Sequence, residues 1–566
     1  MAAALRVNGP ALRRERHFDN RVLTCFAQRP ASVAQMLIDA VARNGAGDAV
    51  VCGPERLSWL QLDALSARLA RGLQRRGIGA GDRVALLLSN SVAFVLVTLA
   101  CARLGAVIVP LGVRSQTAEL AHALSDCGAV SAFVDAALLT RLPAADATPA
   151  LSEVCSVAES LVAGGTAAAL ADWLDGETSE GLAHSSDATA AVAYVADEAD
   201  LAAIVYTSGT TGRPKGAMLT QLNIVHSAMH YEAAMGLTSA DRSLACVPLS
   251  HITGLVAQLA TMLRVAGTLL ILPVFKAADF LALAVRERAT HTIMVPAMYT
   301  LCLLRDDLRA HDLSAWRIGA FGGAPMAPAT IAALAAQLPA LVLMNAYGAT
   351  ETTSPATLMP AEFGVAGGAG GAHHASVGRV VACGELLVMD PTGREVASGE
   401  SGEVWIKGPM IATGYWNNPA ATADSFVGGF WRSGDVGRLD ADGFLYLHDR
   451  LKDVINRGGF KVYPAELEAV LAQHPRVLEA AVIGTPCPVL GERVHAFVAL
   501  REAAPGEATS TGIDALARAL TAFIQALVSD YKVPESWTLQ TEPLPRNANG
   551  KLMKSALRAQ LAATRA

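Results

Sequence analysis

Amphipathic helical segments that alternate with short apolar strands constrain the fold more than any other feature of this sequence. Helical periodicity over residues 32–43 and 59–76 is followed by apolar runs at 84–88 and 106–109. A second run contains six strand-like segments bounded by turn residues, at 202–207, 244–248, 268–272, 292–295, 318–321 and 341–346. Strands separated by helices form parallel sheets covered by helices. The sequence therefore predicts an α/β fold.

The length and composition predict several compact units. A chain of 566 residues exceeds the size of one ordinary core, and 52% of its residues are hydrophobic while 17% are charged. Residues 138–200 are rich in Ala, Ser and Asp and are expected to form a surface excursion. After residue 376 the strands shorten, and turns at 390–393 and 440–443 favour a β-rich subdomain. The architecture is expected to change again near Asp449, where a compact C-terminal α/β region begins.

Charge and cysteine content exclude some functions and favour a compartment. The net charge of −6 provides no chain-wide cationic field for nucleic acid or anionic lipid. Nine scattered cysteines without a CxxC pair favour reduced thiols and a cytoplasmic location, and the first residues lack the apolar core of a secretory signal. Two apolar stretches, 92–111 and 252–273, are interrupted by Arg103 and Arg264 and are expected to be buried helix–strand pairs. Peripheral membrane association stays open.

One glycine-rich segment has the composition of a phosphate-binding loop. It follows the predicted strand 202–207 and precedes a helix expected near Leu219. Glycines allow backbone N–H groups to surround phosphate oxygens, while hydroxyl and ammonium groups add donors and charge. The spacing differs from a Walker A motif, and a flexible surface loop is the alternative. The candidate phosphate ligands are Thr207, Ser208, Gly209, Thr210, Thr211, Gly212 and Lys215.

This loop and further motifs resemble the adenylate-forming superfamily of acyl-CoA synthetases, carrier-charging adenylation domains and luciferases. The resemblance covers the chain from about residue 30 onward. The further blocks, in the order of the family, are Pro248-Leu-Ser-His251-Ile-Thr-Gly, Gly322-Gly-Ala-Pro325, Tyr347-Gly-Ala-Thr-Glu351, Gly402-Glu-Val-Trp-Ile-Lys-Gly-Pro, Trp431-Arg-Ser-Gly-Asp435, Asp449-Arg-Leu-Lys452-Asp, Gly458-Gly-Phe-Lys-Val-Tyr-Pro-Ala-Glu466 and Pro545-Arg-Asn-Ala-Asn-Gly-Lys551. Acyl-CoA synthetases are the most similar branch.

The resemblance implies an ATP site in which several of these residues contact the nucleotide. Tyr347 is expected to stack on adenine, while Asp435 and Arg450 bind the ribose. Glu351 would repel triphosphate oxygens unless a divalent cation lay between them, so Mg²⁺ is expected there, held with Thr207. Taken singly, these side chains would be interpreted as core, turn-capping or surface residues. The remaining residues assigned to ATP or AMP are Gly323, Ala324, Pro325, Gly348, Thr350 and Lys551.

Lys551 is the principal catalytic candidate, although a lysine beside a turn is ordinarily a surface residue. An ammonium at the α-phosphate would offset the charge that develops when a carboxylate attacks it. Glu351, Thr350 and His251 complete the catalytic assignment, and the acyl pocket is assigned to His251, Gly322 and Gly348. Departures from the family pattern at Ala349, Asn547 and Ala548 leave the pocket shape open.

The resemblance also implies a mobile lid and a second substrate. Residues 1–448 would form the N-terminal domain that binds ATP and acid, 449–452 the hinge and 453–566 the C-terminal lid domain. Lys452 would be the hinge residue, and rotation about it would present Gly458, Gly459, Phe460 and Lys461 to coenzyme A. The large domain is expected to contain two α/β subdomains and a β-rich one, and the lid to be α+β.

The expected reaction is therefore ligation of a carboxylic acid to coenzyme A through an acyl-AMP. A medium- or long-chain fatty acid is favoured, because the His251 block carries no cation to pair a second carboxylate, and an aryl acid is the next alternative. A carrier protein could replace coenzyme A as the acceptor, although no carrier domain follows in this chain. A catalytically silent nucleotide-binding protein is a third alternative. The chain is expected to be a monomer or a homodimer.

Overall fold

The computed structural model of the protein describes residues 10–18, 20–157, 173–174, 194–207, 213–364, 373, 375–458, 460–501, 510–546 and 552–565. The chain divides into two compact units. The first contains Met1–Leu386, Trp405–Arg432 and Gly443–Leu445, and the second contains Leu387–Val404, Ser433–Asp442 and Tyr446–Ala566. A hinge at 449–452 stays a prediction, since compactness alone does not identify a hinge.

The first unit contains two mainly parallel sheets, as the alternation of helices and strands predicts. In the six-stranded sheet only the edge strand β10 is antiparallel to its neighbour. Its order is β10 (Lys215–Thr220), β9 (Leu201–Thr207), β6 (Val107–Pro110), β5 (Arg83–Leu87), β7 (Ser131–Asp135) and β8 (Glu153–Val157). Strand β8 corrects part of the expected surface excursion, because Cys155 and Val157 alternate inward and are buried. Residues 158–172 and 175–193 of that excursion lie outside the described residues.

The nine-stranded sheet contains most of the strands that the sequence predicts. Strands β3 and β11–β15 run parallel, and antiparallel pairing joins β4 to β3, β16 to β15 and β17 to β16. The order is β17 (Arg379–Val380), β16 (Ser354–Leu358), β15 (Val342–Ala349), β14 (Ile318–Gly322), β13 (His291–Met294), β11 (Arg242–Ala245), β12 (Thr268–Ile271), β3 (Asp48–Cys52) and β4 (Glu55–Ser58). Strand β11 ends before Pro248, three residues earlier than expected, consistent with the missing N–H of proline.

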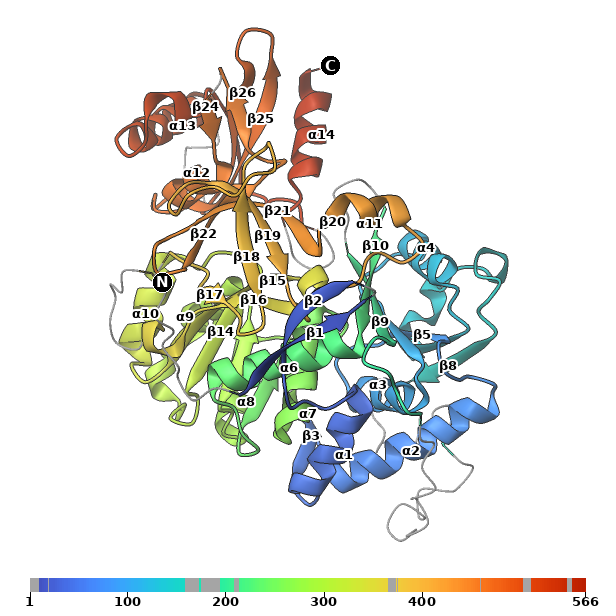
Figure 1. Ribbon diagram of the computed structural model, residues 1–566. Coiled ribbons are helices and arrows are strands. Elements are labelled where there is room, and N and C mark those ends of the chain that lie inside the picture. The colour runs from blue at the N-terminus through green and yellow to red at the C-terminus, as the bar shows by residue number, and fades with distance from the viewer. Residues whose placement is uncertain are drawn as a thin grey trace. The chain divides into compact units, whose positions relative to one another are not determined.

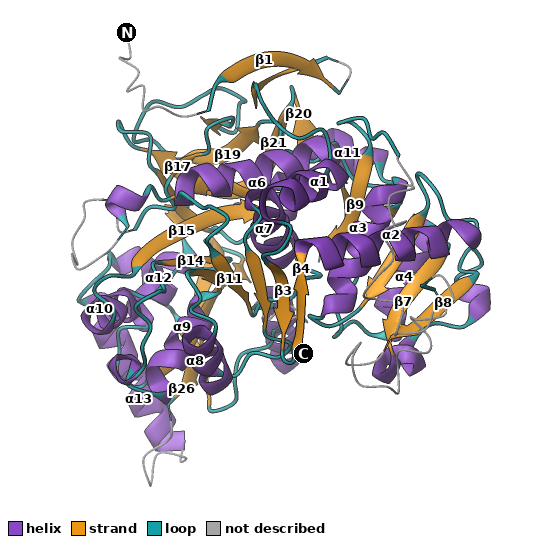
Figure 2. Ribbon diagram, turned by 90° about the horizontal axis from the view of Figure 1, so that it is seen from below, coloured by secondary structure: helices purple, strands orange, loops and turns teal. Residues whose placement is uncertain are grey.

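Helices cover both sheets, and some lie between them. Figure 2 shows α1, α6 and α7 between the two sheets, and α6 contacts β9, β10 and β16. Ser32 caps α1 and a Ser58–Gln61 capping box starts α2, at the boundaries that the sequence predicts. The helices are α1 (Val33–Asn44), α2 (Trp59–Arg75), α3 (Val92–Leu104), α4 (Thr117–Cys127), α6 (Gln221–Met235), α7 (Thr261–Val265), α8 (Ala277–Arg286), α9 (Pro296–Arg305) and α10 (Pro328–Gln337).

The two long apolar stretches are buried helix–strand pairs, as predicted. The first forms α3 and β6, with the helix ended by Gly105 in a left-handed conformation at φ 69°. The second forms a π-helix, η4 (Thr253–Ala260), followed by α7 and β12. Within the described part of the chain, no helix is both long and apolar enough to cross a membrane.

Short strands and turns follow residue 376, which confirms the expected β-rich subdomain. Gly393 and Gly443 close its turns at positive φ, 80° and 78°. Its sheet contains β18 (Glu385–Met389), β19 (Gly402–Lys407), β21 (Phe430–Leu439) and β20 (Phe426–Val427), with β22 (Leu445–Arg450) paired to β21, and α11 (Pro419–Ser425) precedes β20.

The C-terminal region of the second unit is an α+β structure around its own apolar core. Its sheet, visible in Figure 1, orders β24 (Phe460–Val462), β23 (Ile455–Arg457), β26 (Gly491–Leu500) and β25 (Val477–Cys487), with β27 (Ser536–Gln540) parallel to β26. Three helices complete it, α12 (Pro464–Leu471), α13 (Ser510–Gln525) and α14 (Lys554–Arg565). The described chain begins with a hairpin of β1 (Leu12–His17) and β2 (Arg21–Phe26), which the sequence patterns do not predict.

Candidate functional site

The predicted phosphate loop connects two strands of a β-hairpin. Thr207 ends β9 and Lys215 begins β10, and the two residues are register partners. The Thr207 hydroxyl donates to the Lys215 carbonyl oxygen at 3.4 Å. Residues 208–212, which carry the other candidate ligands Ser208, Gly209, Thr210, Thr211 and Gly212, lie outside the described residues. The helix expected near Leu219 is α6, which begins at Gln221 with Thr220 as its cap; the strand β10 that precedes it was not predicted.

Helix α4 holds both strands of this hairpin (Figure 1). The ring Nε2 of His122 lies 3.0 Å from the carbonyl oxygen of Pro214, at the end of the loop. One helical turn further along, Asp126 accepts a hydrogen bond from the hydroxyl of Tyr206 at 2.5 Å. Residues four apart share a face of a helix, so one face of α4 supports both ends of the loop.

The Tyr347–Glu351 segment leaves β15 through close backbone contacts that explain its glycine. The pairing of β15 with β16 shifts between Tyr347 and Gly348. A Cβ atom on Gly348 would lie 2.2 Å from the carbonyl oxygen of Ser354, so no other residue fits without a backbone shift. Thr350 and Glu351 then form a 3₁₀ turn, η6 (Thr350–Thr352), and are 9% exposed.

Strained backbone follows Glu351 directly. Thr353 and Ser354 both adopt positive φ, 50° and 81°, which is costly for residues with a Cβ atom. The strain turns the chain back into β16 and keeps the Glu351 carboxylate at the buried start of that strand. Such strained conformations cluster at functional sites in proteins.

The carboxylate of Glu351 has a hydrogen-bond donor that the motif analysis missed. The hydroxyl of Tyr415 donates to Glu351 Oε1 at 2.7 Å, and the Ala412 N–H donates to the Glu351 carbonyl oxygen at 2.8 Å. Tyr415 lies 64 residues away, in a segment without regular structure, and a Gly-Tyr-Trp sequence alone carries no functional signal. A buried carboxylate and the Thr207 hydroxyl are oxygen ligands of the kind Mg²⁺ prefers, so these residues fit the expected ion.

Gly322 ends β14 beside the end of β15. It pairs with Ala346, and a Cβ atom on Gly322 would lie 2.3 Å from the Ala346 carbonyl oxygen. Gly323 follows at φ 77°, and Ala324 and Pro325 are exposed. Ligands of open α/β sheets bind beyond the carboxyl ends of parallel strands, and β14 and β15 end together at such an edge.

His251 precedes the π-helix η4 in the first unit. Its carbonyl oxygen accepts the Leu255 N–H at 2.9 Å. Gly254 is required there, because a Cβ atom would lie 2.3 Å from the carbonyl oxygen of Pro248. Most residues of η4 are apolar and buried. The assignment of His251 to the acyl pocket stays a prediction.

Asp435 and Arg450 lie on adjacent strands of the second unit. Asp435 in β21 is 6% exposed, and Arg450 Nε in β22 lies 2.7 Å from its Oδ1. Arg450 Nη1 also donates to the carbonyl oxygen of Ser433 at 3.3 Å. The sequence motifs thus identified two residues that form an ion pair, and their carboxylate and guanidinium can accept from and donate to vicinal hydroxyls.

The remaining predicted residues also belong to the second unit. Lys452 is exposed in the turn after β22. Gly458, at φ 59°, donates its N–H to the Leu490 carbonyl oxygen at 2.7 Å, and Phe460 and Lys461 are exposed on β24. Gly459 and Lys551 lie outside the described residues, although a β-bridge between Arg546 and Leu552 brackets Lys551.

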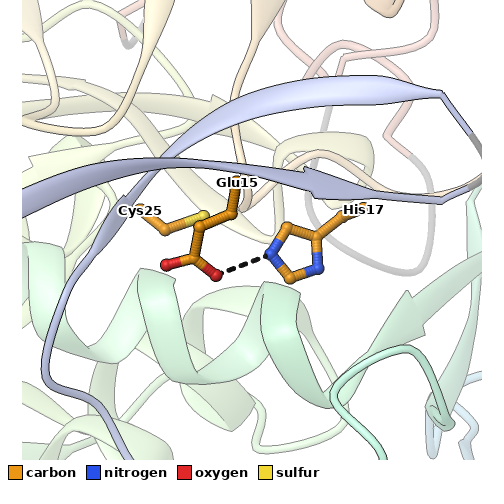
Figure 3. Close-up of side chains that lie close together, drawn as sticks. All are labelled: Glu15, His17 and Cys25. Atoms are coloured by element: carbon orange, nitrogen blue, oxygen red, sulfur yellow. Dashed lines mark hydrogen bonds and ion pairs between the residues drawn. The ribbon is translucent and has the colours of Figure 1, made fainter.

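Three potential metal ligands, Glu15, His17 and Cys25, gather on the inner face of the β1–β2 hairpin (Figure 3). The Glu15 carboxylate is already engaged, because Arg29 Nη1 and Nη2 donate to its two oxygens at 2.9 and 2.8 Å. Arg29 also binds both oxygens of Glu198 at 2.6 and 2.7 Å. A guanidinium at this distance repels a cation, so the cluster is better described as a buried ion-pair network.

This network is expected to stabilise the first unit. The Arg29 side chain is 7% exposed, and its hydrogen bonds lower the pKa of Glu15 from 4.5 to about 2. Arg29→Ala should lower the free energy of unfolding by about 3 kcal/mol, because it removes the buried guanidinium that the Glu15 and Glu198 carboxylates share. Since the folded-state pKa of Glu15 is depressed, its stabilisation is present above pH 4.5 and lost as the pH falls toward 2.

Denaturant unfolding at a series of pH values checks both statements. The acid-induced loss of stability should be smaller in Arg29→Ala than in the unmodified protein. Arg13→Ala is the matched control, because Arg13 also pairs with Glu15 at 3.0 Å but its side chain is 63% exposed, so its removal should cost about 0.5 kcal/mol or less. Equal effects of the two substitutions would contradict the interpretation.

Solved structures with the same fold define the class of this protein. The crystal structure of the anthranilate CoA ligase AuaEII in complex with anthranoyl-AMP matches it with a TM-score of 0.82 and 25% sequence identity, covering 95% of this chain and 99% of the other. ATP-bound MatB from Rhodopseudomonas palustris matches with a TM-score of 0.80 and 29% identity, over 94% and 99% of the two chains. The fold is that of the adenylate-forming enzymes.

The protein belongs to the AMP-binding enzyme family. Residues 37–416 match the family itself, and residues 466–551 match the AMP-binding enzyme C-terminal domain. A feruloyl-CoA synthase of Amycolatopsis sp is 35% identical over 90% of this chain and 95% of its own length. A long-chain-fatty-acid–CoA ligase of Mycobacterium tuberculosis is 33% identical over 90% and 94%. The protein is thus an ATP-dependent, AMP-forming enzyme of the acid–CoA ligase family.

A carrier-protein ligase is also among the relatives. The fatty acid–[acyl-carrier-protein] ligase ScoC of Streptomyces coeruleorubidus is 33% identical over 90% of this chain and 92% of its own length. The named relatives therefore differ in both the acid and the thiol acceptor, which leaves these two properties to experiment.

Proposed function

We propose that the protein joins an apolar monocarboxylic acid to coenzyme A in two steps. In the first, a carboxylate oxygen attacks the α-phosphorus of ATP, and pyrophosphate leaves. In the second, the coenzyme A thiol loses its proton and its sulfur attacks the acyl carbonyl carbon, and AMP leaves. The observation that carries this proposal is that family matches cover both the 37–416 and 466–551 parts of a chain that retains Glu351, Asp435 and Lys551.

The residues of the first unit bind and orient the triphosphate in this proposal. Peptide N–H groups and hydroxyls of the 207–212 loop, with Lys215, hold phosphate oxygens. Glu351 and Thr207 would hold Mg²⁺, which supplies positive charge that offsets the charge of the triphosphate. Tyr347 provides an aromatic face for adenine at the end of β15.

The residues of the second unit bind the ribose and complete the chemistry. Asp435 accepts hydrogen bonds from ribose hydroxyls, and Arg450 orients that carboxylate. Lys551 places an ammonium beside the oxygens of the attacking carboxylate and of the α-phosphate. Rotation about Lys452 exchanges this arrangement for one in which Gly458, Gly459, Phe460 and Lys461 bind coenzyme A.

A medium- or long-chain fatty acid is the first candidate for the acid, and an aryl acid is the second. The chain from Pro248 to Leu263 contains no Lys or Arg, and η4 contributes buried apolar side chains. An apolar pocket wall favours a substrate with a single carboxylate. The relatives named feruloyl-CoA synthase and long-chain-fatty-acid–CoA ligase support both classes of acid.

A product screen tests the acid and the acceptor together. Purified enzyme is incubated with ATP, Mg²⁺ and coenzyme A, and with either straight-chain fatty acids of graded length or benzoic and cinnamic acids, and thioesters are detected by mass spectrometry. Fatty acyl-CoA formation that exceeds aryl-CoA formation supports the first candidate. Release of AMP without a thioester favours a carrier protein, and absence of acid-dependent pyrophosphate exchange with every acid contradicts the proposal.

A further inference from the structure

Tyr415 occupies a fixed position beside the strand that follows the phosphate loop. The segment around it lies along β10: the Trp416 N–H donates to the Gly216 carbonyl oxygen at 2.7 Å, and the Met218 N–H donates to the Gly414 carbonyl oxygen at 2.9 Å. Tyr415 itself forms a β-bridge with Ala217, two residues after Lys215. Its backbone is therefore held by hydrogen bonds on both sides.

The Tyr415 side chain contacts two predicted ligands of the nucleotide. It is 5% exposed, and its hydroxyl donates to Glu351 Oε1 at 2.7 Å. The ammonium of Lys215 lies 4.5 Å from the centroid of its ring. A phenol hydroxyl carries its proton at neutral pH, so Tyr415 is the donor in this pair and the Glu351 carboxylate is the acceptor.

These contacts orient the Glu351 carboxylate and the Lys215 ammonium without an ion pair between the two groups. A hydrogen bond to one oxygen of a carboxylate fixes its plane and leaves the other oxygen for a cation. A ring face holds an ammonium by a cation–π interaction without an anionic partner. A direct Lys215–Glu351 ion pair would instead neutralise the two groups that ATP and Mg²⁺ require.

We propose that Tyr415 is a positioning residue that orients Glu351 for Mg²⁺ through its hydroxyl and Lys215 for phosphate through its ring. The proposal rests on the proposed function, because it takes Glu351 as a ligand of the ion and Lys215 as a ligand of the triphosphate. It makes two separable predictions, since the hydroxyl and the ring can be removed independently.

The experiment measures ATP affinity by titration calorimetry on the full-length enzyme, without acid, in the presence of Mg²⁺ or of a chelator. Tyr415→Phe keeps the ring and removes the hydroxyl. In the presence of Mg²⁺ the Kd for ATP should rise about tenfold, because one hydrogen bond to a charged group is lost. In the presence of the chelator the Kd should not change. Tyr415→Leu also removes the ring, so it should weaken ATP binding under both conditions.

Tyr299→Phe is the matched control. Tyr299 is equally buried in the first unit, and its hydroxyl donates to the Ala320 carbonyl oxygen at 2.8 Å, so its removal costs a comparable hydrogen bond away from Glu351. It should leave both Kd values unchanged. Thermal unfolding of each variant verifies that the proteins compared are folded.

Comparison with Glu351→Gln tests the Tyr415 proposal separately from the assignment of Glu351 as a ligand of Mg²⁺. In that background Tyr415→Phe should cause no further change in Mg²⁺-dependent affinity, because the group that it orients no longer binds the ion. The Tyr415 proposal alone would be overturned if the losses of Mg²⁺-dependent ATP affinity in the two variants were additive. It would also be overturned if Tyr415→Phe kept the unmodified affinity while Glu351→Gln lost it. A Glu351→Gln variant with unchanged Mg²⁺ dependence would overturn the assignment of Glu351 in the proposed function, and the role of Tyr415 with it.

Discussion

Lys551→Ala should reduce acid-dependent exchange of labelled pyrophosphate into ATP by at least about a hundredfold, the cost of removing one charge-stabilising donor from a transition state. The second half-reaction, thioester formation from supplied acyl-AMP and coenzyme A, should continue near its unmodified rate, because no anion attacks a phosphorus atom in that step. Rapid-quench measurement of each half-reaction checks the two statements separately.

The control for this variant is Lys276→Ala, which removes an exposed ammonium just before α8. It should leave both half-reactions unchanged. If Lys551→Ala slowed thioester formation as much as adenylate formation, the lysine would be needed for folding or for both steps, and its assignment to adenylation would be wrong.

Lys452→Pro should have the opposite effect. Lys452 occupies the third position of a turn in which the Asp453 N–H donates to the Arg450 carbonyl oxygen at 2.9 Å. Proline fixes φ near −65°, so the rotation between the two arrangements would be blocked. Adenylate formation should persist. Thioester formation from acyl-AMP should fall by about a hundredfold, because the reacting groups are then misplaced relative to each other.

Lys452→Ala separates backbone freedom from charge in the same assays. It removes the ammonium and keeps the rotation, so both half-reactions should remain. Loss of thioester formation in the alanine variant would show that the side chain, and not the hinge, matters at this position. Equal loss of both half-reactions in Lys551→Ala and Lys452→Pro would refute the division of labour between them.

Short-range patterns made much of the fold predictable. Helix α2 begins at the Ser58–Gln61 capping box, and Gly105 separates α3 from β6, because both signals act within a few residues. Strand β8 was missed because a five-residue strand at a sheet edge acquires its burial from β7 and not from its own sequence. Strand β10 was missed because it is stabilised by pairing with β9, which local propensity does not describe.

The candidate site shows the same limit. Tyr347, Glu351 and Asp435 could be selected because each belongs to a compact motif with a chemical reason for its residue types. Tyr415 could not, because its importance arises from a contact with Glu351 across 64 residues of sequence. The Arg29 network joins Glu15, 14 residues before Arg29, to Glu198, 169 residues after it, and no periodicity signals this contact.

The hairpin that carries the phosphate loop has a consequence for selectivity between nucleotides and simple anions. Five residues of extended chain, 216–220, separate Lys215 from the start of α6 at Gln221, roughly 20 Å at the rise of a β-strand. The positive pole of that helix therefore lies too far along the chain to attract a phosphoryl group bound at the loop. Inorganic phosphate and sulfate should therefore compete poorly with ATP, and competition should weaken further as ionic strength screens the single lysine charge.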